Sequence, residues 1–255
     1  MLCLLAMVFL LSGCTQDHYH SYEKALALFA EGDYYGASEK FLKLGDYQNA
    51  ETYANYSLGL TYYEQGEYVE ALPYFEKTQD FMYGKERYRY CLAYDNEASE
   101  NFDRAAELYL LLGDYEDANI HYQYCIGRSA TLKKDFETAL FAFEEAGTYS
   151  DSQSRALDIQ MAVYKQANEH YEAGDYEIAI NLFGLLGDYL NSREMAIHCT
   201  HYFRDQRYNE AERLASEEKW MDAYVIYSSL SGYNDAQVKA NNIADFLGID
   251  ITTQE

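Results

Sequence analysis

The sequence predicts an all-α protein, an α-solenoid of about six helix-turn-helix repeats with a C-terminal capping helix. Three observations predict it. Four positions recur in six copies, and the first four copies follow one another at a 34-residue period. Offsets of three, four and seven residues within each copy belong to one helix face. A single proline in 255 residues permits long helices. A two-helix unit cannot cover its own apolar face, so neighbouring units must stack.

The four recurring positions mark one amphipathic helix, helix B, and the turn that follows it. An aromatic residue opens the helix as Tyr34, Tyr68, Phe102, Phe136, Tyr176 and Trp220. Three residues later comes alanine, as Ala37, Ala71, Ala105, Ala139, Ala179 and Ala223. A second aromatic follows as Phe41, Phe75, Tyr109, Phe143, Phe183 and Tyr227, and a third as Tyr47, Phe81, Tyr115, Tyr149, Tyr189 and Tyr233. The alanines allow close helix approach, and the rings fill the space beside them.

Glycines mark the ends of helices in the repeats. Gly45 is predicted to end helix B, and Asp46 is predicted to cap the next helix, helix A. In the fifth and sixth repeats the spacing grows to 40 and 44 residues. The longer segments, residues 150–173 and 190–218, are expected to be long helices or loops. Residues 235–247 fit a terminal capping helix, so the solenoid is assigned to residues 21–247 and a frayed tail to 248–255.

The N-terminus has a different character. Leu2 to Leu11 is an unbroken apolar run that is too short to span a bilayer and has the length of a signal-peptide core. Leu11-Ser12-Gly13-Cys14 resembles a bacterial lipobox, although no Lys or Arg precedes the apolar run. The resemblance implies a signal peptide at residues 1–13, lipidation of Cys14, a short tether at 14–20, and an extracytoplasmic, lipid-anchored protein at the cell membrane. A plain cleaved signal or a buried N-terminal helix are the alternatives.

The stretch from Leu58 to Phe75 resembles the tetratricopeptide repeat, with Leu58-Gly59, Tyr62, Gly66, Tyr68, Ala71 and Phe75 in that family's order. The resemblance extends over roughly residues 18 to 240, although the usual closing proline is absent. It implies that helix A of each repeat lines a groove that binds a protein or peptide. The groove residues that it implies are Tyr19, Tyr22, Tyr53, Tyr56, Arg87, Tyr90, Tyr94, His121, Tyr124, Arg128, Tyr164 and Tyr208.

Six of these tyrosines form a ladder, one per repeat, twelve residues before the first aromatic: Tyr22, Tyr56, Tyr90, Tyr124, Tyr164 and Tyr208. They could contact a partner or pack between repeats, and identity in every repeat favours packing. Neighbouring positions vary, and Lys85, Arg87, Arg89 and Arg128 form a basic cluster. Arg87 and Arg128 could clamp a carboxylate of the partner, or could pair with acids of this chain.

Composition narrows the functional classes. A formal net charge of -24 argues against nucleic-acid binding and leaves the lipid anchor as the only expected membrane contact. Cys91, Cys125 and Cys199 occupy equivalent positions too far apart for disulfides and are expected to be buried. No metal site, cofactor site or catalytic motif is recognisable, so an enzyme is not expected. The expectation is a non-catalytic protein- or peptide-binding scaffold. The alternatives are a glycan-binding envelope module using the tyrosine-lined groove, or an envelope-assembly lipoprotein.

Overall fold

The computed structural model describes residues 2–249, and side chains from residue 17 onward. Over this range the chain forms thirteen α-helices, so the predicted all-α class is confirmed. The predicted lipidation site, Cys14, and residues 250–255 of the predicted tail lie outside the described side chains. Backbone contacts divide the chain into two units, residues 1–156 and 157–255. The boundary falls within α9 (Ser152–Ala173).

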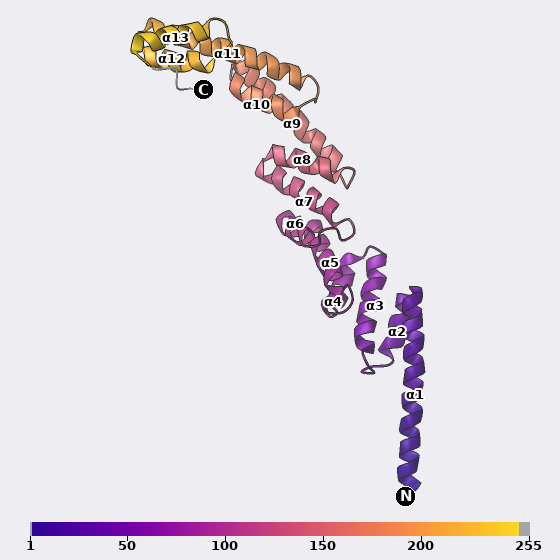
Figure 1. Cartoon of the computed structure of the whole chain (residues 1–255). Helices are drawn as coiled ribbons and strands as arrows, with labels where there is room; N and C mark the ends of the chain where they lie inside the picture. Colours follow the sequence, from indigo (N-terminus) through magenta and orange to yellow (C-terminus); the bar gives the residue numbers. More distant parts are fainter. Residues whose placement is uncertain (1, 250–255) are drawn as a thin grey trace. The chain divides into compact units, whose positions relative to one another are not determined.

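In unit 1 each helix packs against the next one in sequence (Figure 1). The helices are α1 (Leu2–Glu31), α2 (Tyr34–Leu42), α3 (Ala50–Glu64), α4 (Tyr68–Glu76), α5 (Gly84–Ala98), α6 (Phe102–Leu110), α7 (Ala118–Lys133) and α8 (Phe136–Ala146). Helix α1 includes residues 14–20, which the sequence assigned to a tether. Among the described residues, no helix is both long enough and apolar enough to cross a membrane.

Unit 2 continues the same alternation of helices A and B. It contains the larger part of α9, followed by α10 (Tyr176–Leu186), α11 (Ser192–Ser216), α12 (Trp220–Ser229) and α13 (Ala236–Leu247). The even-numbered helices α2 to α12 are the six predicted helices B, and each begins at the predicted first aromatic residue. Helix α13 lies where the sequence placed the capping helix.

The recurring residues build the core. All six recurring alanines are fully buried, and the second aromatic of every repeat is at most 1% exposed. Gly59 and Gly127 lie in helices A directly against these rings. A Cβ atom on Gly127 would lie 2.6 Å from the Phe143 ring, and one on Gly59 would lie 2.8 Å from Phe75. Small residues on helix A therefore allow the ring of helix B to pack against its backbone.

The junctions differ in detail from the prediction. Helix α3 begins at Ala50 with Asn49 at its N-cap, three residues after the predicted cap, Asp46. The intervening residues form a turn in which Gln48 has a φ of 51°. Asp33 and Asp135 do cap helices B, because their carboxylates accept bonds from the backbone N–H of Gly36 and Thr138.

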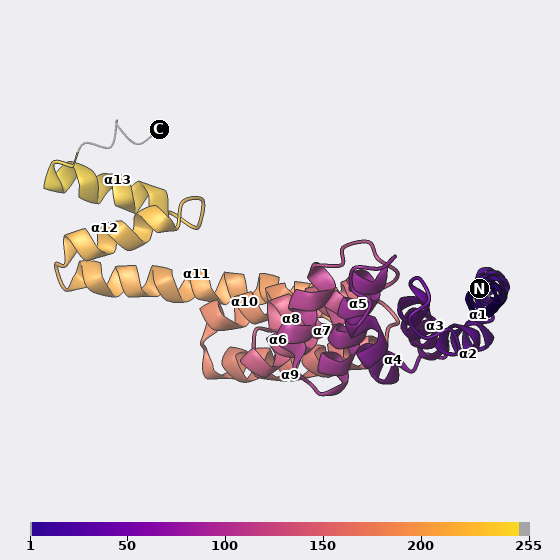
Figure 2. The ribbon, with the colours of Figure 1, turned by 90° about the horizontal axis from the view of Figure 1, so that it is seen from below.

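The long segments of repeats five and six are uninterrupted helices. Helix α11 extends between α10 at one end and α12 and α13 at the other (Figure 2). In its first half the Tyr202 ring stacks on Tyr176 of α10 at 5.3 Å. In its second half Tyr208 contacts Tyr227 of α12 at 5.7 Å. The extra turns of α11 thus place its contact with α10 and its contact with α12 at different points along the helix.

Candidate functional site

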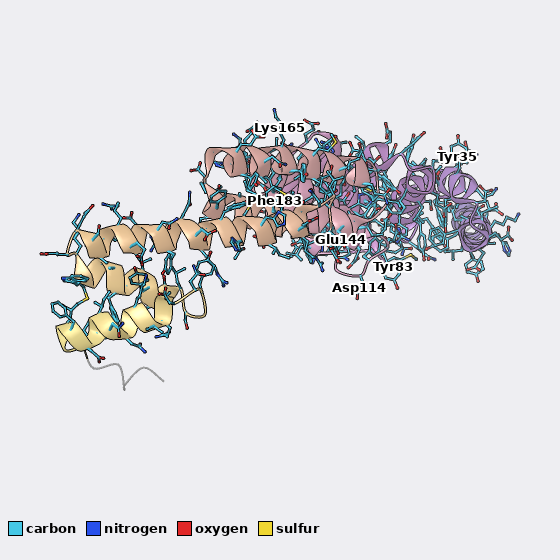
Figure 3. The ribbon with its side chains drawn as sticks, turned by 90° about the horizontal axis from the view of Figure 1, so that it is seen from above. Tyr35, Tyr83, Asp114, Glu144, Lys165 and Phe183 are labelled. Atoms are coloured by element: carbon cyan, nitrogen blue, oxygen red, sulfur yellow. The ribbon has the colours of Figure 1, made fainter. Side chains whose placement is uncertain are left out.

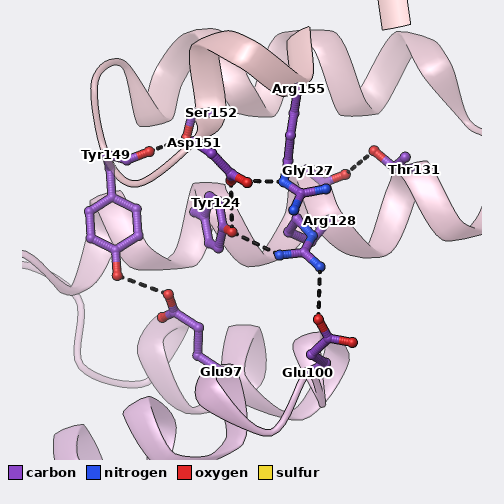
Figure 4. A network of polar contacts seen from close by, with 10 residues as sticks. All are labelled: Glu97, Glu100, Tyr124, Gly127, Arg128, Thr131, Tyr149, Asp151, Ser152 and Arg155. Atoms are coloured by element: carbon purple, nitrogen blue, oxygen red, sulfur yellow. Dashed lines mark hydrogen bonds and ion pairs between the residues drawn. The ribbon is translucent and has the colours of Figure 1, made fainter. Parts of the chain in front are cut away.

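The candidate site is a cavity of ≈ 290 Å³ in unit 1, between neighbouring helices A. Figure 4 shows the polar contacts of several residues that line it. The end of α5, the middle of α7 and the junction after α8 form its wall. Three of the predicted groove residues, Tyr94, Tyr124 and Arg128, lie on this wall. The full lining is Tyr94, Glu97, Ala98, Glu100, Phe102, Tyr124, Arg128, Tyr149 and Ser150. The cavity therefore contains aromatic rings, two carboxylates and one guanidinium.

Arg128 is fixed by three contacts. Its Nη1 donates to the Tyr124 hydroxyl at 2.8 Å, and its Nη2 lies 3.3 Å from Oε1 of Glu100. Its guanidinium lies 4.2 Å from the centre of the Phe102 ring, close enough for a cation–π interaction. The side chain is only 15% exposed, so screening by water is limited. Because Tyr124 and Arg128 are one helical turn apart, α7 presents both to the same side.

Glu100 occupies an unusual backbone position. Its φ is 60°, at the turn before helix B where the first two repeats have Gly32 and Gly66. A residue with a side chain costs more than glycine in this left-handed conformation. The conformation belongs to the turn that carries the Glu100 carboxylate to Arg128. This ion pair is largely open to water on the carboxylate side, where Glu100 is 73% exposed.

Two residues of the wall, Glu97 and Tyr149, belong to a buried polar group centred on His121. The His121 ring is 2.7 Å from a Glu97 carboxylate oxygen and 2.8 Å from the Tyr149 hydroxyl. Tyr149 donates to the other Glu97 oxygen at 2.8 Å. His121 is 4% exposed and the Glu97 side chain 10%. Burial, followed by the Glu97 charge, raises the pKa of the Tyr149 phenol, so this hydroxyl stays a hydrogen-bond donor.

The tyrosine ladder is engaged in packing between repeats. The first four rings are between 2% and 6% exposed, and the last two are partly buried. In five repeats the hydroxyl donates to the Asn or Asp 27 residues later. That residue stands directly before the next helix A. These pairs are Tyr22–Asn49, Tyr90–Asp117, Tyr124–Asp151, Tyr164–Asn191 and Tyr208–Asp235. We call each such pair a ladder bond. The spacing survives in the longer repeats because their extra residues precede the tyrosine.

The second repeat departs from this rule, and Arg87 compensates. Position 83 is tyrosine, which has no carboxylate, so its backbone N–H donates to the Tyr56 hydroxyl at 3.3 Å. Arg87 adds a bond from Nη1 to the same hydroxyl at 2.6 Å. Its guanidinium lies 5.6 to 5.7 Å from the rings of Tyr56, Tyr63 and Tyr83. Its Nε is buried and bonds to no residue that the structure describes.

The other predicted groove residues are distributed unevenly. Tyr19 is half exposed, Tyr53 and Tyr94 are partly buried, and His121 belongs to the buried polar group. Of the predicted basic cluster, Arg89 donates to the backbone carbonyl of Leu111 at 3.3 Å. Arg128 pairs with an acid of this chain, whereas Arg87 has no acidic partner among the described residues. The three arginines of this cluster thus make different contacts.

Sequence reasoning missed Glu97, Glu100 and Ser150. Glu97 stands seven residues after Tyr90 in α5, where the equivalent residue in the second repeat is Tyr63. A lone acid among 43 Asp and Glu residues carries no distinguishing signal. Tyr149 could have been found, because it belongs to the third recurring aromatic row.

The three described cysteines are free and buried, as the sequence predicts. Burial raises the pKa of the Cys91 thiol to about 12, and it raises the pKa of the Cys125 and Cys199 thiols as well. These thiols are therefore packing groups at neutral pH. Among residues 17–249, no group of three or more His, Cys, Asp or Glu side chains is arranged to hold a metal ion.

The fold and site define a helical-repeat protein with a polar, aromatic-lined cavity between neighbouring helices A. No model of a known protein family matches this chain, and no curated protein matches it either.

Proposed function

We propose that the chain is a non-catalytic scaffold that binds a protein or peptide segment along the helix-A face of unit 1. The observation that carries this proposal is a contrast between two rows on helices A. In unit 1 the constant tyrosines are buried, and three of the four make ladder bonds. Several variable neighbours, including Tyr19, Arg87, Tyr94 and Arg128, remain partly exposed. A surface that varies from repeat to repeat can recognise an irregular partner, whereas a constant buried row supports the frame.

The tetratricopeptide-like character of the repeats supports the same proposal. Helix pairs, the buried alanine and the close glycine–aromatic contact at Gly59 and Phe75 all follow the pattern of that family's motif. The ladder bond stands at the junction where the family's proline is missing. In such repeats helix A faces the binding groove, so α5 and α7 are the helices that we assign to recognition.

Arg87 gives the partner one chemical requirement. Its Nη1 is held by Tyr56, while Nε has no acceptor among the described residues. The Arg87 side chain is partly exposed, and no acid among the described residues pairs with it. We assign a carboxylate of the bound segment to the accessible part of this guanidinium. Arg128 is less free, because Glu100 already lies beside it.

The proposed location follows from the N-terminal sequence. Cleavage before Cys14 and its lipidation would anchor the chain outside the cytoplasm, on the cell membrane. Mass spectrometry of the mature N-terminus tests this part separately. A diacylated Cys14 supports it, and an unprocessed Met1 rejects it.

Photocrosslinking tests the binding face. A photoreactive residue replaces Tyr94, on the cavity wall, or Phe141 on α8, which is 62% exposed. Both positions belong to unit 1, and Phe141 lies on a helix B. The proposal predicts that position 94 captures one protein reproducibly and that position 141 does not. Equal capture at both positions, or capture at neither, contradicts the proposal.

A further inference from the structure

The cavity between α5 and α7 has features that a peptide-binding face alone does not require. Its volume of ≈ 290 Å³ lies just below the usual range of small-molecule sites, about 300 to 1,000 Å³. A ligand that fills it is therefore small.

The wall has hydrogen-bond acceptors and donors that are not fully used within the protein. Each Glu97 carboxylate oxygen takes one bond, from Tyr149 or from His121, and each has a second lone pair. Arg128 has five N–H groups, of which one bonds Tyr124 and one faces Glu100. Acceptors and donors in so small a space suit a ligand with several hydroxyl groups, since a hydroxyl both donates and accepts.

The aromatic part of the wall suits the other side of such a ligand. Of the four aromatic residues in the lining, Tyr94 and Tyr149 are partly exposed, whereas Tyr124 and Phe102 are buried. The face of an aromatic ring carries partial negative charge, and the C–H groups of a sugar ring are weakly positive and apolar. A sugar ring can therefore pack on a tyrosine face and direct its hydroxyls to Glu97 and Arg128.

The charges of the wall select against an anionic ligand. Glu97 and Glu100 outnumber Arg128, and the whole chain has a formal net charge of -24, so an anion is repelled. A neutral ligand avoids this repulsion and can use both the carboxylates and the guanidinium as hydrogen-bond partners.

The wall is also fixed before any ligand arrives. His121 and Tyr149 hold Glu97, and Phe102 and Tyr124 hold Arg128. Figure 4 shows the Tyr149–Glu97 and Tyr124–Arg128 bonds. Side chains that are already ordered lose little entropy on binding.

From these observations we infer that the cavity lined by Tyr94, Glu97, Arg128 and Tyr149 binds a single neutral sugar ring. This site shares Tyr124 with the tyrosine ladder, and it goes beyond the proposed scaffold role.

Saturation-transfer NMR with methyl glucoside and N-acetylglucosamine tests the inference on the full chain. We expect saturable binding in the millimolar range by at least one of the two sugars. Glucuronate, an anionic sugar, should bind at least tenfold more weakly. Ala98 is exposed at the rim, so Ala98→Trp fills the cavity without removing a polar group. This variant should abolish binding.

Ala27→Trp, at an exposed position of α1, is the matched control and should bind as the wild type does. Arg128→Gln should weaken binding at least fivefold, and melting curves establish that each variant is folded. Absence of saturable binding by both neutral sugars overturns the inference, and so does binding that survives Ala98→Trp. Capture from position 94 is read separately, so failure of this site leaves the scaffold proposal intact, and the converse holds too.

Discussion

The ladder bond is a contact between neighbouring repeats. In five of the six repeats a tyrosine from one helix A donates to the Asn or Asp directly before the next helix A, 27 positions along the chain. The bond fixes how one repeat meets the next, because both its ends lie at element boundaries. Where tyrosine replaces the acceptor at position 83, Arg87 supplies the second contact instead.

Removal of a single ladder hydroxyl should therefore weaken the fold. Tyr90→Phe deletes the donor to Asp117 at a site where the ring is 2% exposed. A hydrogen bond to a charged group contributes about 1.5–3 kcal/mol, and we expect a loss of free energy of unfolding in that range. Urea denaturation measures it.

Tyr35→Phe is the control, because the Tyr35 ring is 58% exposed and its hydroxyl bonds to none of the described residues (Figure 3). Its effect should stay within about 0.5 kcal/mol. A loss for Tyr90→Phe no larger than that of Tyr35→Phe would show that ladder bonds do not stabilise the junctions.

Asp151 gives a pH-dependent prediction. The Arg155 guanidinium, followed by the Tyr124 hydroxyl, lowers the pKa of this carboxyl below its usual range. A lowered folded-state pKa contributes stability that is fully present above the unfolded value of about 3.9. That stability is lost as the pH falls through the folded value. Asp151 is 47% exposed, so solvent reduces the effect.

Asp151→Asn should therefore be less stable than the wild type at pH 7, and the difference should shrink toward zero below about pH 3.9. Denaturation at a series of pH values measures the difference. A difference that grows on acidification would contradict the assigned role of the charge.

At the scale of elements, the sequence predicts where helices B begin better than it predicts the rest. All six begin at the expected aromatic residue because that residue, the alanine and the second ring are all buried in the same core. The sequence predicts the N-cap of α3 three residues before its observed position. The turn around Gln48 has a positive φ, and no glycine in the sequence indicates it. The sequence does not decide the length of α11, because repeat spacing alone does not distinguish a long helix from a loop.

The same comparison explains what could be predicted of the site. Tyr94, Tyr124 and Arg128 follow from repeat positions, so the resemblance finds them. Glu97 depends on His121, which lies 24 residues away at a position where no other repeat has histidine. A pairing that occurs in only one repeat leaves no periodic signal.

Two glycine-to-alanine substitutions test how closely helices A and B approach, and we expect them to change the stability in opposite directions. Gly127→Ala would put a Cβ 2.6 Å from the Phe143 ring, and overpacking of this kind costs about 1–3 kcal/mol. Gly184 in α10 has no neighbour within 4 Å of such an atom. Gly184→Ala should therefore stabilise the protein by about 0.5–1 kcal/mol through helix propensity. Thermal unfolding of both variants measures the signs, and stabilisation by both would contradict the packing.

At the scale of the whole molecule, charge dominates. The chain has 43 acidic and 19 basic residues, and self-repulsion of this size opposes the folded state. Salt shortens the Debye length from about 30 Å at about 0.01 M to about 8 Å at about 0.15 M. We expect the melting temperature to rise over this range by a few degrees, as followed by circular dichroism. A melting temperature that falls with salt would mean that surface ion pairs outweigh the repulsion.

The account depends most on recognition by Arg87, a partly exposed cation of α5. Titration of the captured partner against Arg87→Ala tests it directly, with Arg89→Ala as control. Arg89 lies two residues away in the same helix and bonds a backbone carbonyl. We predict at least tenfold weaker binding for Arg87→Ala, about 1.4 kcal/mol, and unchanged binding for the control. Equal affinity of the two variants, both folded, would contradict the central claim.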